Sequence, residues 1–293
     1  MRLPVLRAYK MLVFFSTKRR KIEMSNLYVS DLDGTLLRSN ETLSQFTIDT
    51  INDLTSKGML FSYATARSLV TAKKVTKGLD THFPLIIYNG AFIIENVTEE
   101  ILVAHYFEND IAEVLEELFS NNIFPIVYAY INGVEKFSYI SEKCTVGMQK
   151  FLQSRNGDKR TNIVNRSDEL VKGDLFYITC IDTPEKLAPF YEKYKDKYHV
   201  VYQCDIYTGE QWLEIMPGKA SKSNAIKELK EKLKCEKLIT FGDGKNDIDM
   251  FEMSDERYAV ENADDGLKAI ATKIIESNNN DGVAKWLKEN VMV

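Results

Sequence analysis

Residues 26–36 read NLYVSDLDGTL, a short apolar run followed by two acidic residues, a glycine and a threonine. The run from Leu27 to Ser30 predicts a buried strand, and Gly34 permits the turn by which the chain leaves that strand. Alternate side chains of an extended backbone share a face, so Asp31 and Asp33 are predicted to point the same way. Reactive groups of open parallel sheets gather beyond the carboxyl ends of the strands, which makes this turn a candidate for chemistry.

Strand and helix signals alternate on both sides of this stretch. A helical pattern begins at Ser44 and stops at Gly58, as expected for a glycine that follows a helix. Strand-like runs follow at 59–64 and 84–88, and the same rhythm returns after Gly218 with a helix and then a strand at 237–241. This alternation predicts an α/β fold with a Rossmann-like core built on a parallel sheet.

The middle of the chain follows another rhythm, with helices and several aromatic-rich strands that do not alternate regularly. It predicts an inserted α+β cap domain, whose aromatic residues we expect to form the core of its sheet. We therefore divide the chain into a catalytic core at 26–90 and 211–293 and a cap at 91–210 that selects the substrate. Residues 1–25 are predicted to be a loosely ordered extension.

The extension is basic, because residues 1–23 hold seven basic residues and one acidic residue. Its apolar run at 11–15 is shorter than a membrane span or the core of a secretory signal. A surface-binding arm, a loosely packed tail and an upstream start codon all remain open as explanations.

The overall composition is that of an ordinary globular protein. The chain has 293 residues, a formal net charge of −5 and 44% hydrophobic residues. This excludes a disordered chain and a multi-span membrane protein, and it provides no basic footprint for nucleic acid. Four widely spaced cysteines form no Cys-x-x-Cys pair, which favours reduced thiols and a cytoplasmic location: Cys144, Cys180, Cys204 and Cys235.

Four predicted strand ends carry polar side chains that should meet at one edge of the sheet. They are Asp31 with Asp33, then Thr65, Asn89, and Asp243 with Asp247. Carboxylates that converge in this way repel one another unless a cation lies between them, and ligands that are all oxygen favour Mg²⁺. Lys222, Arg67 and Thr65 would supply donors to an anionic substrate.

Asp31 is the best candidate for a nucleophile. A carboxylate can attack phosphorus and form an aspartyl-phosphate, which divides one difficult displacement into two easier steps. Asp33 could protonate the leaving alkoxide and then activate water for the second step.

The motif at 31–36, with Thr65 next and the turn at 242–247 last, resembles the haloacid dehalogenase-like phosphatases, most closely the Cof-type branch with its large cap. The resemblance covers about residues 26–293. It implies that Asp31 is the nucleophile and Asp33 the general acid/base. It also implies that Thr65 and Lys222 bind the phosphoryl group. Mg²⁺ would be bound by Asp31, the Asp33 carbonyl and Asp243, with support from Asp247. Contacts with phosphate or substrate are implied for Gly34, Asn89, Gly90 and Asn246.

The sequence departs from the family pattern at Ala66 and Ser223, where glycine is frequent. Both departures could alter loops near the phosphate, but neither removes a catalytic group. Lys219 competes with Lys222 for the motif lysine, and the run at 214–217 favours Lys222. Arg67 is predicted to assist in binding the phosphate, and the alternative explanation is that it forms an ion pair on the surface.

These residues predict a Mg²⁺-dependent phosphatase for a small phosphorylated metabolite, such as a sugar phosphate or a phosphorylated cofactor. A phosphotransferase or phosphomutase using the same aspartyl-phosphate is the alternative, and an idle sugar-phosphate sensor is a third hypothesis. A dinucleotide oxidoreductase is excluded because no Gly-x-Gly-x-x-Gly follows the first strand. The predicted partner is a small phosphate ester, without nucleic acid or a membrane span, and the oligomeric state stays open.

Overall fold

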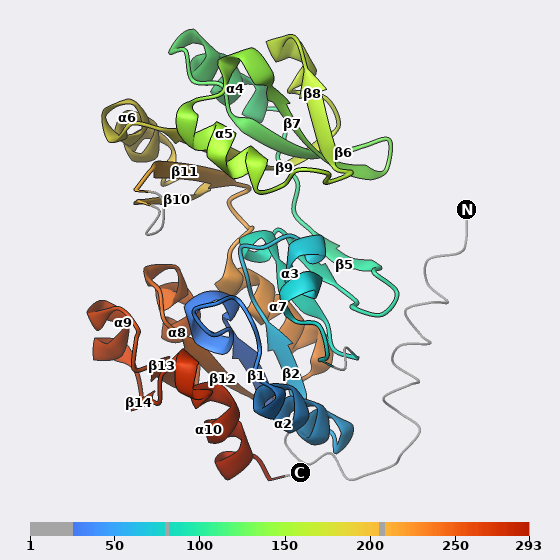
Figure 1. Cartoon of the computed structure of the whole chain (residues 1–293), viewed down its shortest axis with the longest axis vertical. Helices are drawn as coiled ribbons and strands as arrows, with labels where there is room; N and C mark the ends of the chain where they lie inside the picture. Colours follow the sequence, from blue (N-terminus) through green and yellow to red (C-terminus); the bar gives the residue numbers. More distant parts are fainter. Residues whose placement is uncertain (1–25, 80–81, 205–208, 293) are drawn as a thin grey trace.

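The computed structural model describes residues 26–79, 82–204 and 209–292. The chain folds into a lower part built on a parallel sheet and an upper part built on a second sheet (Figure 1). The predicted extension at 1–25 lies outside the described residues. No helix in the described ranges is long and apolar enough to cross a membrane.

The lower part is built on a five-stranded parallel sheet with the order β14-β13-β12-β1-β2. The predicted first strand, β1, lies between β12 and β2 and is buried over most of its length. The bounds of the strands are β1 Asn26–Ser30, β2 Leu60–Tyr63, β12 Lys237–Gly242, β13 Glu256–Val260 and β14 Lys273–Ile275. The predicted α/β fold with a Rossmann-like core is therefore confirmed.

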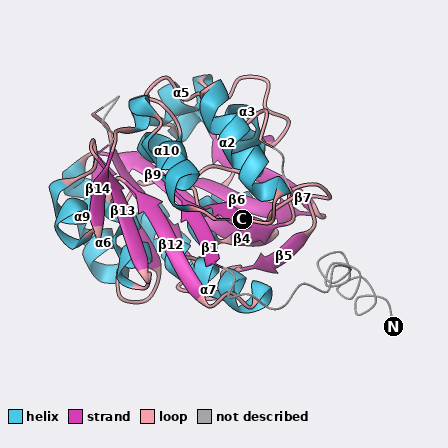
Figure 2. Cartoon of the chain, turned by 90° about the horizontal axis from the view of Figure 1, so that it is seen from below, coloured by secondary structure: helices cyan, strands magenta, loops and turns pink. Residues whose placement is uncertain are grey.

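Helices cover both faces of this sheet. In Figures 1 and 2, α2 and α10 lie on one face and α7 lies on the other. The Ser44 hydroxyl accepts a hydrogen bond from the Thr47 backbone N–H at 3.0 Å, which caps the predicted first helix. The bounds of the helices are α2 Gln45–Ser56, α3 Leu69–Val75, α7 Lys222–Leu233, α8 Ile248–Glu252, α9 Asp265–Ile270 and α10 Gly282–Asn290.

A small antiparallel sheet extends the lower part beyond β2. It consists of β3 Leu85–Ile87, β4 Phe92–Ile94 and β5 Ile101–Ala104, in that order. A parallel bridge between Ala64 and Ile86 joins β3 to the end of β2. The chain segment that follows β3 is thereby brought beside the turn that follows β2.

The upper part is a six-stranded sheet with the order β10-β11-β9-β6-β7-β8, antiparallel except for the parallel pair β7–β8. Helices α4 and α6 contribute to a hydrophobic core on one face, and α5 packs against residues of the other. The bounds are α4 Ile111–Ser120, β6 Ile126–Ile131, β7 Val134–Ile140, α5 Val146–Gln153, β8 Thr161–Val164, β9 Asp174–Asp182, α6 Pro184–Tyr194, β10 His199–Cys204 and β11 Gln211–Met216.

Strand pairing does not follow the predicted boundaries at 90/91 and 210/211. Strands β4 and β5 come after the first boundary, yet they pair with β3. Strand β11 comes after the second boundary, yet it pairs with β9 and β10 of the upper sheet. Hydrogen bonding thus assigns 92–104 to the lower part and 211–216 to the upper part, because a strand belongs to the sheet that satisfies its backbone groups.

Aromatic rings join the two parts. The ring of Tyr88, which follows β3, lies 5.0 Å from that of Phe176 in β9 and 5.7 Å from that of Tyr128 in β6, measured between centroids. Phe92 of β4 lies 4.7 Å from the same Phe176. These side chains are buried, as expected for the core of the sheet, and they hold the cap on the lower part.

A polar network surrounds the Tyr88 hydroxyl. This hydroxyl donates to Glu135 Oε1 at 2.5 Å and accepts from Arg160 Nη1 at 3.1 Å. Arg160 Nη1 also donates to Glu135 at 2.6 Å, and the rest of its guanidinium binds Asp158. Each buried charge in the network therefore has a partner of opposite sign.

The turn after β3 predicts a sharp difference between two glycine substitutions. Gly90 has φ +96°, and a Cβ there would lie 2.1 Å from the backbone oxygen of Ser221. Gly133 has φ +76°, with nothing within 4 Å of a Cβ. We expect Gly133→Ala to lower the free energy of unfolding by about 1 kcal/mol and Gly90→Ala to lower it by at least about 3 kcal/mol. Urea unfolding of both variants measures the difference, and equal losses would contradict it.

Candidate active site

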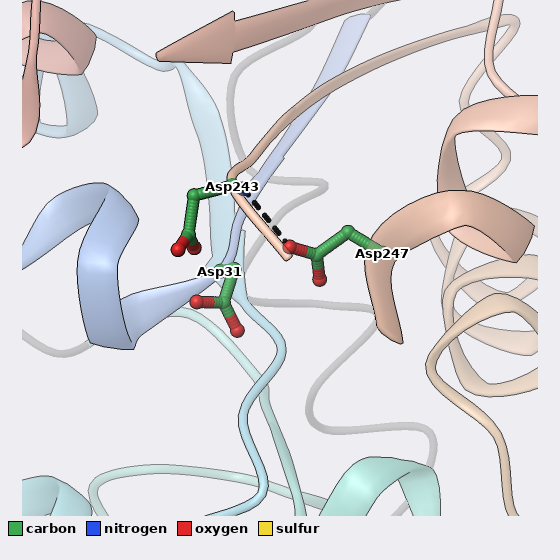
Figure 3. Close-up of side chains that lie close together, drawn as sticks. All are labelled: Asp31, Asp243 and Asp247. Carbon is green, nitrogen blue, oxygen red and sulfur yellow. Dashed lines mark hydrogen bonds between the residues drawn. The ribbon is translucent and has the colours of Figure 1, made fainter. Parts of the chain in front are cut away.

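The candidate site lies where the central strands of the parallel sheet end. Strand β1 ends at Ser30, so Asp31 is the first residue beyond the sheet, and Asp243 follows β12 directly. Figure 3 shows the carboxylates of Asp31, Asp243 and Asp247 gathered at this edge. Each offers an oxygen that lies within 4.8 Å of the others.

Lys222 brings a positive charge to this group from the first position of α7. Its Nζ donates to Asp31 Oδ1 at 2.5 Å and to Asp247 Oδ1 at 2.8 Å. All three side chains are buried, at 3% exposure for Lys222, 8% for Asp31 and 0% for Asp247. Lys219, the competing lysine, is exposed at the turn before α7. The structure thus brings Lys222, rather than Lys219, to Asp31.

Asp247 holds the shape of the turn at 242–247. Its Oδ2 accepts hydrogen bonds from the backbone N–H groups of Asp243 at 3.0 Å and Gly244 at 3.1 Å. Because its Oδ1 accepts from Lys222, both of its oxygens have partners within the protein. Asp247 is therefore built to position Asp243 and Lys222.

Asp243 is held from the opposite side by the first motif. Its Oδ1 accepts a hydrogen bond from the Thr35 hydroxyl at 2.6 Å. A Cβ at Gly34, which has φ +81°, would lie 2.3 Å from Asp243 Oδ2. Only glycine leaves room for this carboxylate, so Gly34 serves both the turn and the close approach of the two motifs.

The charges around Lys222 do not balance. Burial raises the pKa of Asp31, and the carboxylates of Asp247, Asp243 and Asp33 raise it further against the lowering effect of Lys222. Burial and the charge of Asp247 raise the pKa of Asp243 to about 6. Three carboxylates thus share one ammonium group in a site with little water.

The donor set fits a divalent cation with a preference for oxygen. Asp31 Oδ2 and Asp243 Oδ2 accept no hydrogen bond from any described residue, whereas the other oxygen of each carboxylate is engaged. Oxygen ligands without nitrogen or sulfur suit Mg²⁺. An additional positive charge here would relieve the repulsion among the three carboxylates.

Asp33, the predicted acid/base, is bound by Arg67 in this structure. Arg67 Nε and Nη2 donate to its two oxygens at 2.8 and 2.5 Å, and Arg67 Nη2 also lies 3.4 Å from Glu41. The Asp33 side chain is 47% exposed, so solvent reaches it. Arg67 therefore forms an ion pair with Asp33, and its role as a helper in phosphate binding stays a prediction.

Thr65 and Asn89 lie at adjacent strand ends. The backbone N–H of Asn89 donates to the Thr65 carbonyl at 2.9 Å, and the Thr65 hydroxyl accepts from the Arg67 N–H at 3.1 Å. Asn89 Nδ2 donates to the hydroxyl of Tyr177 in the cap at 3.1 Å, while its buried Oδ1 has no partner among the described residues. Asn246 is exposed on the 242–247 turn, and no hydrogen bond joins its side chain to the other predicted site residues.

Sequence reasoning missed three residues near this edge. Thr35 was part of the quoted motif but had no assigned role, although a hydroxyl two residues beyond Asp33 was a usable signal. Tyr177 and Glu214 are buried residues of the neighbouring cap strands β9 and β11. No local pattern distinguishes these two residues from the remainder of the sheet.

Comparisons with known proteins agree with this geometry. A sequence profile of the haloacid dehalogenase-like hydrolases matches residues 28–287. The 5-amino-6-(5-phospho-D-ribitylamino)uracil phosphatase YitU of Bacillus subtilis is 24% identical over 289 residues, which cover 90% of this chain and 96% of that protein. The crystal structure of TM0651 from Thermotoga maritima has a TM-score of 0.73 at 28% identity and covers 92% of this chain and 98% of its own. A haloacid dehalogenase-like hydrolase from Bacteroides thetaiotaomicron shares the fold, with a TM-score of 0.73 at 22% identity over 91% of this chain and all of its own.

Because the profile spans most of the sequence, the chain belongs to the haloacid dehalogenase-like hydrolases. Within that family it is a Cof-type phosphatase, and its enzyme class is that of the phosphoric monoester hydrolases. The resemblance read from the motifs is thereby confirmed.

The buried ion pairs predict how the two candidate lysines differ. Replacing Lys222 with Met leaves Asp31 and Asp247 without their shared ammonium, and breaking a buried pair typically costs about 3–5 kcal/mol. The exposed Lys219→Met variant is the matched control, with an expected change within about 0.5 kcal/mol. Urea unfolding in EDTA measures both. Equal stability of the two variants would contradict the assigned role of Lys222.

Glu214 predicts a dependence of stability on pH. Burial raises the pKa of this carboxyl from 4.5 to about 7, so the folded chain keeps a proton that the unfolded chain releases. The contribution of Glu214 to the free energy of unfolding should therefore fall by about 3 kcal/mol between pH 4.5 and 7 and stay level above that range. Glu214→Gln removes this part of the decline. The stability of the variant minus that of wild type should therefore be higher at pH 8 than at pH 5. Exposed Glu192→Gln is the control, and parallel pH profiles for wild type and Glu214→Gln would contradict the prediction.

Proposed function

We propose that the protein is a Mg²⁺-dependent phosphatase that hydrolyses a small phosphorylated metabolite through an aspartyl-phosphate on Asp31. The observation that carries the proposal is the buried Asp31 carboxylate, paired with Lys222 through one oxygen and left without a hydrogen bond from the described residues at the other. A carboxylate in this state has one oxygen oriented by the lysine and one available for attack. The relative named for a phosphorylated ribityl compound supports a small phosphate ester as the substrate class.

In the first step, Asp31 Oδ2 attacks phosphorus and the bond between phosphorus and the ester oxygen breaks. Lys222 and the Thr65 hydroxyl hold the phosphoryl oxygens, whose charge they offset. Asp33, in its protonated form, gives its proton to the departing oxygen, which leaves as an alcohol. Arg67 donates a hydrogen bond to each oxygen of Asp33, so this step requires that Arg67 move away from Asp33 when the substrate binds.

In the second step, water attacks the phosphorus of the aspartyl-phosphate, and Asp33 takes a proton from that water. The bond between phosphorus and Asp31 Oδ2 breaks, which restores the Asp31 carboxylate and releases inorganic phosphate. Gly34, Asn89, Gly90 and Asn246 are proposed to border the bound phosphate ester. If another hydroxyl replaced water in this step, the same residues would support a phosphotransferase or a phosphomutase.

We propose that Mg²⁺ would be held by Asp31 Oδ1, the oxygen that does not attack phosphorus, together with the Asp33 main-chain carbonyl and Asp243, with Asp247 positioning Asp243. When bound, the cation would offset the charge of the carboxylates and of the phosphoryl oxygens. We further propose a cytoplasmic location and no nucleic-acid partner, as the composition indicates.

Phosphate release from a panel of sugar phosphates, nucleotides, phosphorylated cofactors and p-nitrophenyl phosphate tests this function. Wild type with Mg²⁺ should release phosphate, and EDTA or Asp31→Asn should abolish release. Asp33→Asn should lose at least about 100-fold in kcat on alkyl phosphates. Its loss on p-nitrophenyl phosphate should be far smaller, because nitrophenolate leaves without a proton.

Two outcomes would contradict the proposal. Full activity of Asp31→Asn would exclude Asp31 as the nucleophile. A folded, Mg²⁺-loaded wild type that forms no phosphoenzyme and releases no phosphate from the panel would instead favour the idle sensor.

A further inference from the structure

A cavity of about 710 Å³ lies in the cap, between α5 and the neighbouring strands β7 and β8. Its strand side presents the rings of Phe137 and Tyr139 and the side chain of Ile163. Its helix side presents Gln149, Gln153 and, just beyond the end of α5, Arg155. We call this cavity the α5 groove. It combines an apolar floor with amide groups and one guanidinium, which is the composition of a small-molecule site.

Arg155 is a cation without an anionic partner in the described structure. Its guanidinium stacks on the Phe151 ring, 3.6 Å from the centroid, and Nη1 donates to the Ser154 hydroxyl at 3.0 Å. No carboxylate of the described residues lies within ion-pair distance of it. Burial lowers the pKa of the Arg155 guanidinium, and the charge of Asp158 only partly offsets this effect.

Asp158, which also lines the groove, and Glu135 of β7 are already bound by another arginine. Both oxygens of Asp158 accept hydrogen bonds from Arg160, at 3.0 and 2.6 Å. Glu135 accepts from Arg160 and from the Tyr88 hydroxyl through the same oxygen. Arg155 is therefore left to bind an anion from outside the protein, because a partly buried guanidinium is stabilised by a planar, charged acceptor.

Three aromatic rings connect the groove with the catalytic edge. The Phe137 ring, which lines the groove, lies 5.9 Å from the Tyr128 ring, measured between centroids. The Tyr128 ring lies 5.6 Å from that of Tyr177, whose hydroxyl accepts from Asn89 at 3.1 Å. A leaving group that passes Asn89 along these rings would reach Arg155 at its far end.

We propose that Arg155 and the α5 groove bind a second anionic group, a carboxylate or a phosphate, at the end of the leaving group opposite the scissile ester. This inference rests on the proposed function and narrows its substrate class to small phosphate esters with two separated anionic groups. Gln149 and Gln153 would hydrogen-bond hydroxyl groups between the two anions. The guanidinium would bind the distal anion through two parallel N–H donors.

Binding to Asp31→Asn protein tests the inference without turnover. Titration calorimetry with Mg²⁺ would compare glucose 6-phosphate with 6-phosphogluconate, which has the same six-carbon chain and a carboxylate opposite the phosphate. Glucose 1,6-bisphosphate distinguishes a distal phosphate from a distal carboxylate. We expect 6-phosphogluconate or glucose 1,6-bisphosphate, which each carry a second anionic group, to bind about 10- to 100-fold more tightly than glucose 6-phosphate.

Arg155→Met in the same background should reduce this affinity ratio to about one, and Arg155→Lys should retain part of it because the charge remains without the planar fork. Arg166→Met removes an exposed cap arginine that pairs with Asp168, so it is the matched control and should leave the ratio unchanged. Three results would overturn the inference. The affinity ratio could be near one with Arg155 in place, Arg155→Met could leave the ratio unchanged, or none of the three ligands could bind. Turnover of p-nitrophenyl phosphate by wild type reports the proposed function separately.

Discussion

Everything at the catalytic edge depends on the repulsion among carboxylates that the parallel sheet forces together. Asp31 and Asp243 follow neighbouring strands, β1 and β12, so their backbones cannot separate without breaking the sheet. One ammonium, that of Lys222, bonds two of the three clustered carboxylates. The Thr35 hydroxyl then holds one oxygen of Asp243, and the turn at 242–247 holds the second oxygen of Asp247. One oxygen of Asp31 and one of Asp243 are left without a hydrogen bond from any described residue, which suits a cation and an attack on phosphorus.

The cap contributes to this edge through its attachment to the turn at 88–90. Tyr88 is held by Glu135 and Arg160 of the cap, and the next residue, Asn89, is held by Tyr177. Gly90 then packs against the backbone of Ser221, the residue before Lys222. The position of the cap is thus linked by direct contacts to the start of α7. A cap joined in this way can hold Lys222 in place beside Asp31.

Local chemistry explains which parts of the fold were predictable. The turn at 31–36, the residue Ser44 that begins the first helix and the glycine at 58 that ends it are each recognisable from a few neighbouring residues. The sequence alone was therefore enough to locate them. The pairing of β4 with β3 and of β11 with β9 depends on contacts between distant residues, so the predicted boundaries at 90/91 and 210/211 did not follow the sheets. Short elements such as β8 and α9 have too few residues for a clear period.

The same distinction applies to the site. The strand-end residues Asp31, Thr65, Asn89 and Asp243 were found because parallel strands place their carboxyl ends at one edge. The bond from Thr35 to Asp243 and the engagement of Asp33 by Arg67 depend on side-chain geometry between loops. Tyr177 and Glu214 belong to the upper sheet, and Arg155 follows α5, so their relation to the catalytic edge appears only when the cap is in place. Their roles follow from contacts, for which the sequence holds no spacing rule.

The stereochemical course at phosphorus tests the central claim, attack by the Asp31 carboxylate, most directly. A phosphate ester made chiral with oxygen isotopes would be hydrolysed in isotopically labelled water, and the configuration of the released phosphate would be determined. Two successive in-line displacements, first by Asp31 and then by water, predict retention of configuration. Inversion would mean that water attacks the substrate directly and would contradict the account.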